Sequence, residues 1–209
     1  MSLPNQQQHH TVEEYLTLER QSEERHEYLD GLIYAMAGES PEHGIVCTNL
    51  VGQFYNQLRG TPCQVLSKDM KVWSGPIRLA QQSTKGLFSY PDLLVVCGAP
   101  EFLDEHRHVL INPTVIIEVL SPSTEAFDRG EKFWRYRTYL SSLAEYLMVA
   151  QSMPMIDHFV HRSGEWVLNT VSGLESTLNL DSIPCSLRLA DVYDRIKFPE
   201  PSEPEPVEQ

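Results

Sequence analysis

Apolar residues follow a helical period in the segment after Ser40. They recur every fourth position between Pro41, which suits the first turn of a helix, and Gly60, which suits its end. The pattern predicts a helix over 40–60 with one apolar stripe, formed by Val46, Leu50, Phe54 and Leu58. A shorter helix is predicted near the N-terminus, where Thr11 and Glu14 have the spacing of a capping box.

The rest of the chain is rich in predicted strands. The clearest signal is the Asp30-Gly31 pair inside 27–34, which predicts a β-hairpin. Continuous apolar runs at 93–97 and 115–120 are typical of strands covered on both faces. Further strands are expected at 64–73 and 146–150, helices at 128–143 and 190–196, and a second hairpin at 156–161 and 166–171 around Ser163-Gly164.

This order of elements is typical of an α/β domain with a mixed central sheet flanked by helices, preceded by an N-terminal helix and β-hairpin. The 209 residues fit one such domain, expected over 11–198, and no internal repeat is visible. The Gln/His-rich residues 1–10 and the Pro/Glu-rich residues 199–209 are predicted to be flexible tails, because neither segment can bury enough apolar surface to fold.

The charge composition argues against a protein that simply coats nucleic acid. The chain has 16 Lys and Arg against 29 Asp and Glu, a net charge of -13, whereas such a coat neutralises many phosphates with basic side chains. An enzyme that gathers its basic groups in one cleft and holds cations with carboxylates stays possible. No apolar signal core or membrane-length apolar window is present, so we expect a cytoplasmic protein without a membrane partner.

The cysteines show neither a C-x-x-C pair nor a nearby histidine partner. This spacing disfavours a zinc site and a small disulfide framework. We therefore expect free, mostly buried thiols at all four positions, Cys47, Cys63, Cys97 and Cys185.

Two carboxylates interrupt or open strands that are otherwise apolar. Asp92 follows Pro91 at the start of one strand, and Glu118 lies among branched aliphatic residues in the middle of another. An unpaired buried carboxylate costs several kcal/mol, so each must be ion-paired, protonated or bound to a cation. Local ion pairs or turn capping would explain them without a site. If the two strands are adjacent, their oxygens can instead converge on Mg²⁺, which prefers oxygen ligands.

The Pro91-Asp92 and Glu118 pattern resembles the PD-(D/E)XK signature, and a longer series of motifs makes the likeness more specific. The series is Glu27-Tyr28-Leu29-Asp30-Gly31, Ser40-Pro41-Glu42-His43, Tyr90-Pro91-Asp92-Leu93, Glu118-Val119-Leu120-Ser121-Pro122-Ser123-Thr124, Asp128-Arg129-Gly130-Glu131-Lys132 and Tyr136. Over residues 11–197 it resembles a bacterial family of restriction-endonuclease-like proteins in the PD-(D/E)XK nuclease superfamily. The resemblance implies a restriction-endonuclease-like core with a Mg²⁺-dependent site that cleaves phosphodiester bonds.

One position departs from the superfamily pattern, which places a lysine two residues after the strand glutamate. Leu120 occupies that position here. Lys132, on the following helix with Arg129 and Tyr136 at helical spacing, is the candidate replacement. The alternative is that this helix carries an ordinary solvated basic stripe and that the protein is catalytically inactive.

The expected roles follow from this resemblance. Asp92, Glu118 and the backbone carbonyl of Val119 would hold Mg²⁺ or Mn²⁺, which activates a water molecule. Lys132 would orient that water or stabilise the transition state. Further candidates for the site are Glu27, His43 and Tyr136.

The function expected from these roles is metal-dependent endonuclease activity, with DNA as the expected substrate. A homodimer would allow one site per chain to cut both strands. The main alternative is an inactive member of the same fold that binds nucleic acid or protein. A two-carboxylate glycoside hydrolase is a third class, but it does not explain the setting of Asp92 and Glu118. The sequence contains no glycine-rich phosphate loop and no Gly-x-Ser-x-Gly motif.

Overall fold

The computed structural model describes residues 9–36, 38–76 and 84–198. Most of the two predicted tails lies outside these residues, but His9 and His10 do not. The backbone N–H of His10 donates to the carbonyl of Gly31 (2.8 Å), and the Tyr28 hydroxyl donates to the carbonyl of His10 (2.9 Å). The end of the segment predicted to be flexible, residue 10, therefore contacts the hairpin through its backbone.

A mixed sheet of six strands forms the centre of the fold, as predicted. Its order is β11-β10-β9-β8-β6-β3, in which β8 and β9 are parallel and all other neighbours are antiparallel. The strands are β3 (Cys63–Ser67), β6 (Leu93–Cys97), β8 (Val115–Leu120), β9 (Glu145–Ala150), β10 (Met155–Arg162) and β11 (Glu165–Ser172). The last two form the hairpin predicted around Ser163-Gly164.

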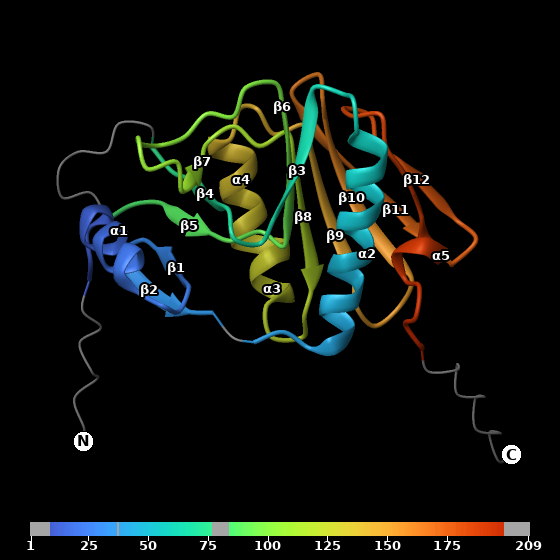
Figure 1. Ribbon diagram of the computed structural model, residues 1–209, viewed down its shortest axis with the longest axis horizontal. Helices are drawn as coiled ribbons and strands as arrows, with labels where there is room; N and C mark the ends of the chain where they lie inside the picture. The colour runs from blue at the N-terminus through green and yellow to red at the C-terminus, as the bar shows by residue number, and fades with distance from the viewer. Residues whose placement is uncertain (1–8, 37, 77–83, 199–209) are drawn as a thin grey trace, which may run out of the picture.

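Helices cover both faces of this sheet, which explains why its central strands β6, β8 and β9 are apolar apart from Glu118 and Glu145. On one face, the apolar stripe of α2 (Pro41–Leu58) packs on Val115, Ile117 and Val119. On the other, α4 (Phe133–Tyr139) packs against Ile116 and Leu120. Figure 1 shows the sheet between α2 and α4. Because side chains alternate along a strand, Glu118 points to the α4 face.

A second sheet of five strands packs beside α4, in the order β2-β1-β5-β4-β7. Its strands are β1 (His26–Leu29), β2 (Leu32–Ala35), β4 (Lys71–Ser74), β5 (Leu87–Ser89) and β7 (Val109–Leu110). The predicted Asp-Gly hairpin is confirmed: Asp30 and Gly31 have φ values of 48° and 99°, in the left-handed region that suits this turn. The single strand predicted over 64–73 is wrong, because a turn closed by Met70 N–H to Ser67 O (3.1 Å) divides it between the two sheets.

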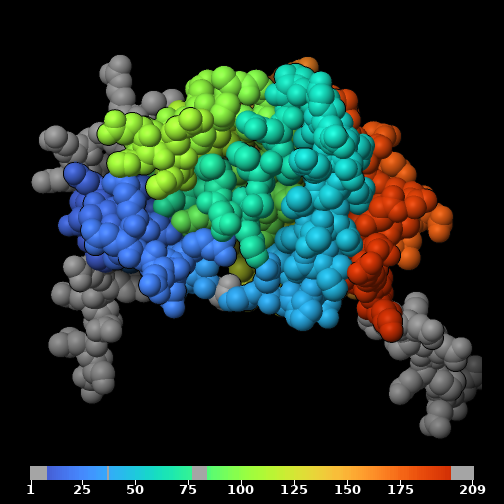
Figure 2. Space-filling model, viewed as in Figure 1, coloured from blue at the N-terminus to red at the C-terminus, as the bar shows by residue number. Residues whose placement is uncertain are grey.

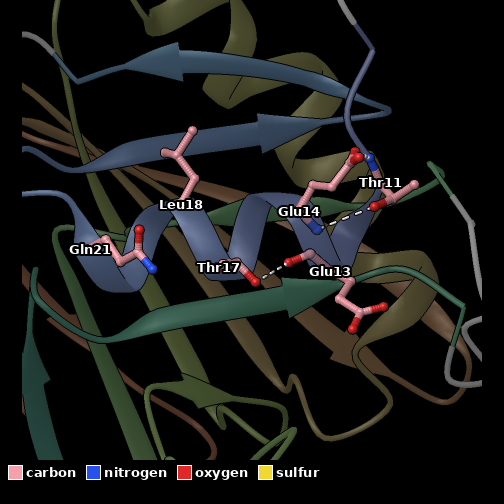
Figure 3. A pocket seen from close by; sticks show the side chains of 6 residues that line it. All are labelled: Thr11, Glu13, Glu14, Thr17, Leu18 and Gln21. Carbon is pink, nitrogen blue, oxygen red and sulfur yellow. Dashed lines mark hydrogen bonds between the residues drawn. The ribbon is translucent and has the colours of Figure 1, made fainter.

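The N-terminal helix α1 (Val12–Gln21) covers the second sheet and has the predicted capping box. The Glu14 N–H donates to Thr11 Oγ1 (3.2 Å), and the Thr11 N–H donates to a Glu14 carboxylate oxygen (2.7 Å). The buried side of the helix carries Val12 and Tyr15. Its outer side borders a shallow hollow, whose described lining has two carboxylates and no basic side chain. The lining residues are Thr11, Glu13, Glu14, Thr17, Leu18 and Gln21 (Figure 3). This hollow is separate from the site described below.

Two other predicted helices differ from their expected bounds. The helix predicted at 128–143 begins earlier and ends at Tyr139, as the continuous series α3 (Glu125–Phe127), η1 (Asp128–Lys132, a π-helical turn) and α4. The helix predicted at 190–196 is only α5 (Leu189–Val192), because Arg195 adopts a left-handed φ of 68°. It follows the small hairpin of β12 (Thr177–Asn179) and β13 (Ser186–Arg188). Within residues 9–36, 38–76 and 84–198, no helix has the length and apolar character to cross a membrane.

The expectation of four free cysteines is also wrong. The antiparallel register of β3 and β6 places Cys63 directly opposite Cys97, with their Cα atoms 3.9 Å apart, and the two form a disulfide. Cys47 and Cys185 are free. The 34-residue separation in sequence gave no sign of the pairing, which depends on strand register alone.

Candidate functional site

Asp92 and Glu118 lie side by side, which meets the condition set for their convergence: their strands are adjacent. In the β6–β8 register Leu93 is opposite Ile117, so Asp92, one residue before β6, faces Glu118. The Asp92 N–H donates to Glu118 Oε2 (3.4 Å), and Asp92 Oδ2 accepts from the backbone N–H of Val119 (2.8 Å). Val119 thus contacts Asp92 through its amide, while the proposed ligand role of its carbonyl stays a prediction.

Lys132 reaches the same point from the opposite layer. Its Nζ lies 3.4 Å from Glu118 Oε1, 3.2 Å from Glu27 Oε1 and 3.2 Å from Asp128 Oδ1, and the side chain is buried. The alternative of an exposed basic stripe is therefore wrong for this lysine. Lys132 ends the π-helical turn η1, a feature often found at functional sites because it redirects side chains.

Tyr136, one helical turn after Lys132, holds Glu118 in place. The tyrosine hydroxyl donates to Glu118 Oε1 (3.2 Å) and lies 2.8 Å from the hydroxyl of Ser89. Glu27, on β1, contacts Lys132, and its carboxylate also accepts a hydrogen bond from the backbone N–H of Tyr90 (3.3 Å). Both additional candidates therefore belong to the cluster.

The sequence pattern put Arg129 on the same helical face as Lys132 and gave Asp128 no role, but in the structure Asp128 is the residue that joins the cluster. Arg129 binds Glu125 (2.7 Å) and Asp157 (2.6 Å) instead of the central carboxylates. Asp128 is buried, and among the described residues no donor makes a hydrogen bond to its Oδ1 beyond the ion-pair contact with Lys132. The spacing of four residues between Asp128 and Lys132 was a visible signal for this pair.

The cluster has a surplus of negative charge. Three carboxylates, from Glu27, Glu118 and Asp128, contact the ammonium group of Lys132, and a fourth, from Asp92, lies beside Glu118. Burial raises the pKa of Glu118 well above its usual value, because the nearby carboxylates add to the desolvation cost and outweigh Lys132. Burial would lower the pKa of Lys132, but the same carboxylates hold it well above its usual value. A divalent cation would relieve this repulsion.

The donors in this cluster suit a hard cation. Glu118 Oε1 is bound by Lys132 and Tyr136, whereas Glu118 Oε2 accepts only the long bond from the Asp92 amide among the described residues. Oδ1 and Oδ2 of Asp92 complete an all-oxygen set next to it. Mg²⁺ and Mn²⁺ prefer such oxygen donors and keep several water ligands, so the residues present fit either ion.

His43, from the first turn of α2, lies next to these oxygens. Its Nε2 donates to Asp92 Oδ1 (2.9 Å). Burial lowers the pKa of His43, but the hydrogen bond and charge of Asp92 outweigh it and leave the pKa raised. The structure therefore brings together all six predicted side chains: Asp92, Glu118, Lys132, Glu27, His43 and Tyr136.

The cluster lies at the base of a cleft of about 1270 Å³. The β1–β2 hairpin and the start of α2 form its walls, and Figure 2 shows the surface hollowed between these two segments. The rim carries the exposed apolar side chains of Tyr34, Met36 and Met153. Among the described residues that line the cleft, the four Lys and Arg side chains are all ion-paired with carboxylates: Arg25, Lys68, Arg129 and Lys132.

Comparison with known proteins agrees with this fold and motif order. A sequence model of the family described as "Uma2: Putative restriction endonuclease" matches residues 12–191. The uncharacterized protein slr1290 of Synechocystis sp. is 34% identical over 188 residues, covering 89% of this chain and 92% of that protein. The uncharacterized protein sll1609 of the same organism is 32% identical over 165 residues, covering 78% and 88%.

A solved structure has a similar fold at low sequence identity. It is a protein of Anabaena variabilis described as "a putative nuclease belonging to DUF820", with a TM-score of 0.68 and 14% identity, and the match covers 88% of this chain and 97% of that one. At this identity the likeness supports the fold alone. The family match spans most of the chain, including every residue of the site. The chain therefore belongs to the Uma2 family, whose members have a restriction-endonuclease-like sequence pattern.

Proposed function

We propose that this protein is a metal-dependent endonuclease that cleaves phosphodiester bonds in DNA. The observation that carries the proposal is the contact between Lys132 Nζ and Glu118 Oε1 (3.4 Å), beside Asp92. Lys132, from a different element, would thus supply the positive charge that the superfamily pattern places at position 120, where this chain has leucine. Membership of a family described as restriction-endonuclease-like supports the choice of nuclease chemistry and of DNA.

Each residue has a role that its contacts support. Asp92 and Glu118 Oε2, with the carbonyl of Val119 as a further candidate, would hold Mg²⁺ or Mn²⁺. The bound ion supplies an acidified water and neutralises charge on the scissile phosphate. Lys132, held by Glu27 and Asp128, orients the attacking water or stabilises the negative charge of the transition state.

Tyr136 and His43 position the two metal-binding carboxylates. Tyr136 directs one oxygen of Glu118 toward Lys132 and leaves the other for the cation. His43 fixes Asp92 through Oδ1, while the Val119 amide binds Oδ2. Both carboxylates are therefore held in place before a cation arrives, which lowers the reorganisation cost of binding it.

Electrostatics make the proposed reaction depend strongly on the cation. The cleft has no unpaired Lys or Arg among its described lining residues, so phosphate must be attracted mainly by the bound metal. The same observation favours the second candidate function, an inactive member of the fold that binds another protein. A homodimer that cuts both strands is part of the first proposal.

A cleavage assay separates the two functions. Supercoiled plasmid and a matched RNA are incubated with the protein in EDTA, in Mg²⁺ and in Mn²⁺. Metal-dependent nicking of the plasmid that is lost in Asp92→Asn and Glu118→Gln supports the nuclease. The control is Glu42→Gln, which removes a carboxylate from the exposed rim of the same cleft. Equal activity of wild type and Asp92→Asn, or no cleavage with either metal, would contradict the proposal.

A further inference from the structure

A second group of metal-binding side chains lies on α2, next to the site described above. Glu39, His43 and Cys47 follow one another at intervals of four residues. A carboxylate oxygen, an imidazole nitrogen and the Cys47 Sγ all lie within 4.8 Å of one another. Residues four apart share one face of a helix, which applies to His43 and Cys47, and Glu39 lies just before Ser40, the N-cap of α2. The prediction that no histidine pairs with a cysteine is therefore wrong for His43 and Cys47.

Asp92 provides an independent sign that a cation suits this place. His43 Nε2 lies 2.9 Å from Asp92 Oδ1 and 3.7 Å from Glu39 Oε2, so two carboxylates face the same nitrogen. The proton on that nitrogen makes its hydrogen bond to Asp92 Oδ1, and Glu39 Oε2 lies just beyond hydrogen-bond distance. A metal ion bound to His43 Nε2 would take the place of this proton and meet both oxygens.

The electrostatic environment of Cys47 points the same way. Burial raises the pKa of the Cys47 thiol, and the negative charges of Asp92 and Glu39 raise it further. The sulfur is therefore at a negative potential that a cation would relieve. Lys68 is the nearest competing cation: it pairs with Glu39 Oε1 and leaves Glu39 Oε2 facing His43.

We infer that Glu39, His43 and Cys47, with Asp92 Oδ1 as the fourth donor, form a second metal site for a thiophilic divalent cation such as Zn²⁺. One sulfur, one nitrogen and two carboxylate oxygens are donors typical of Zn²⁺ and Co²⁺, whereas Mg²⁺ avoids thiolates. The inference goes beyond the nuclease proposal, which concerns a hard cation between Asp92 and Glu118.

Binding requires small changes that the structure allows. Metal–donor bonds of about 2.0–2.3 Å place tetrahedral donors about 3.3–3.8 Å apart, so the separations of up to 4.8 Å among Glu39, His43 and Cys47 must shorten by about 1 Å, while Asp92 Oδ1 already lies 2.9 Å from His43 Nε2. Glu39 can make this movement because its side chain is 35% exposed. The S–H bond of Cys47 breaks as the metal–sulfur bond forms, and the thiol proton passes to the solvent. The proton on His43 Nε2 leaves through the solvent, where it either stays or is taken up by Nδ1 of the same ring, so at least one proton is released for each ion bound.

Cobalt spectroscopy tests the site directly. The full-length protein is titrated with Co²⁺, and the absorption band for charge transfer from thiolate to cobalt is recorded. We expect this band to saturate near one equivalent and to disappear when Zn²⁺ is added, but to persist in excess Mg²⁺. Cys47→Ser should remove the band, and the matched control Cys185→Ser, at the other free cysteine, should keep it.

Three results would overturn the inference: no thiolate band in the wild type, an unchanged band in Cys47→Ser, or displacement of Co²⁺ by an equal concentration of Mg²⁺. Circular dichroism of Cys47→Ser shows whether the variant is folded, and the wild-type titration decides the matter even if it is not. Because the readout is spectroscopic, its failure leaves the nuclease proposal standing. If the wild-type protein shows the cobalt–thiolate band but does not cleave plasmid, only the nuclease proposal is contradicted.

Discussion

Replacing Lys132 by Met removes the one cation from the buried cluster while keeping a side chain of similar length. The ammonium lies 3.2–3.4 Å from carboxylates of Glu27, Glu118 and Asp128. At such a distance and an effective dielectric constant of about 20, one unit-charge pair interacts by about 5 kcal/mol. Desolvation offsets much of this energy. Measured losses on removal of one partner of a buried ion pair are about 3–5 kcal/mol, and we expect a loss of that size in the free energy of unfolding.

This loss has three measurable consequences. At about 2–4 °C per kcal/mol, the melting temperature of Lys132→Met without metal should fall by about 6–20 °C. The loss should shrink at acidic pH, because protonation of the abandoned carboxylates removes their repulsion. Mn²⁺ should stabilise the variant more than the wild type, because the ion replaces the missing positive charge. Cleavage in Mn²⁺ should still fall by about 10²–10³-fold, the usual effect of losing one transition-state stabiliser.

The assay combines thermal unfolding, with and without Mn²⁺, and plasmid nicking at a temperature where both proteins are folded. Lys197→Met is the control, since it removes an exposed lysine far along the chain from the cluster. A melting temperature of Lys132→Met equal to that of the control would refute the electrostatic argument. Normal cleavage by a destabilised Lys132→Met would refute the catalytic role and leave only a structural one.

Further expectations concern the neighbouring positions. Leu120→Lys, introduced into Lys132→Met, should restore part of the cleavage, because residue 120 shares the strand face of the site glutamate; no recovery in a folded double variant would contradict the shared position. Asp92→Asn should abolish metal-induced stabilisation, which in the wild type reaches about 2.7 kcal/mol at 100 times Kd; differential scanning fluorimetry with Mn²⁺ checks this. Asp30→Asn tests pH dependence. Burial raises the pKa of Asp30, but its hydrogen bonds with Arg135 outweigh burial and lower it. The wild type should be more stable than Asp30→Asn above about pH 4 and lose this advantage as the pH falls through the lowered pKa; a constant difference in urea unfolding from pH 7 to pH 2 would be incompatible with it.

The sequence alone determined the features that depend on neighbouring residues. Asp30 and Gly31 both tolerate the positive φ values of a tight hairpin turn, so this pair defines a turn whatever lies around it. In the same way, the four-residue apolar period after Pro41 defines a helix. The mixed α/β character followed from the order of these elements. The sequence also singled out Asp92 and Glu118 as carboxylates that need a partner or a cation, because an isolated buried charge would be too costly.

Only the tertiary structure decided the features that depend on strand register and on packing between layers. The disulfide between Cys63 and Cys97 exists because the β3–β6 register sets them opposite each other. Two of the three carboxylates that contact Lys132 lie on β1 and β8, which are other elements of the chain; only Asp128 lies on η1 itself. Local patterns limit which face a side chain occupies, but they carry no information on which other segment meets that face. The packing of α4 against two sheets therefore sets how deeply Lys132 is buried, and burial in turn sets the strength of its ion pairs with the carboxylates.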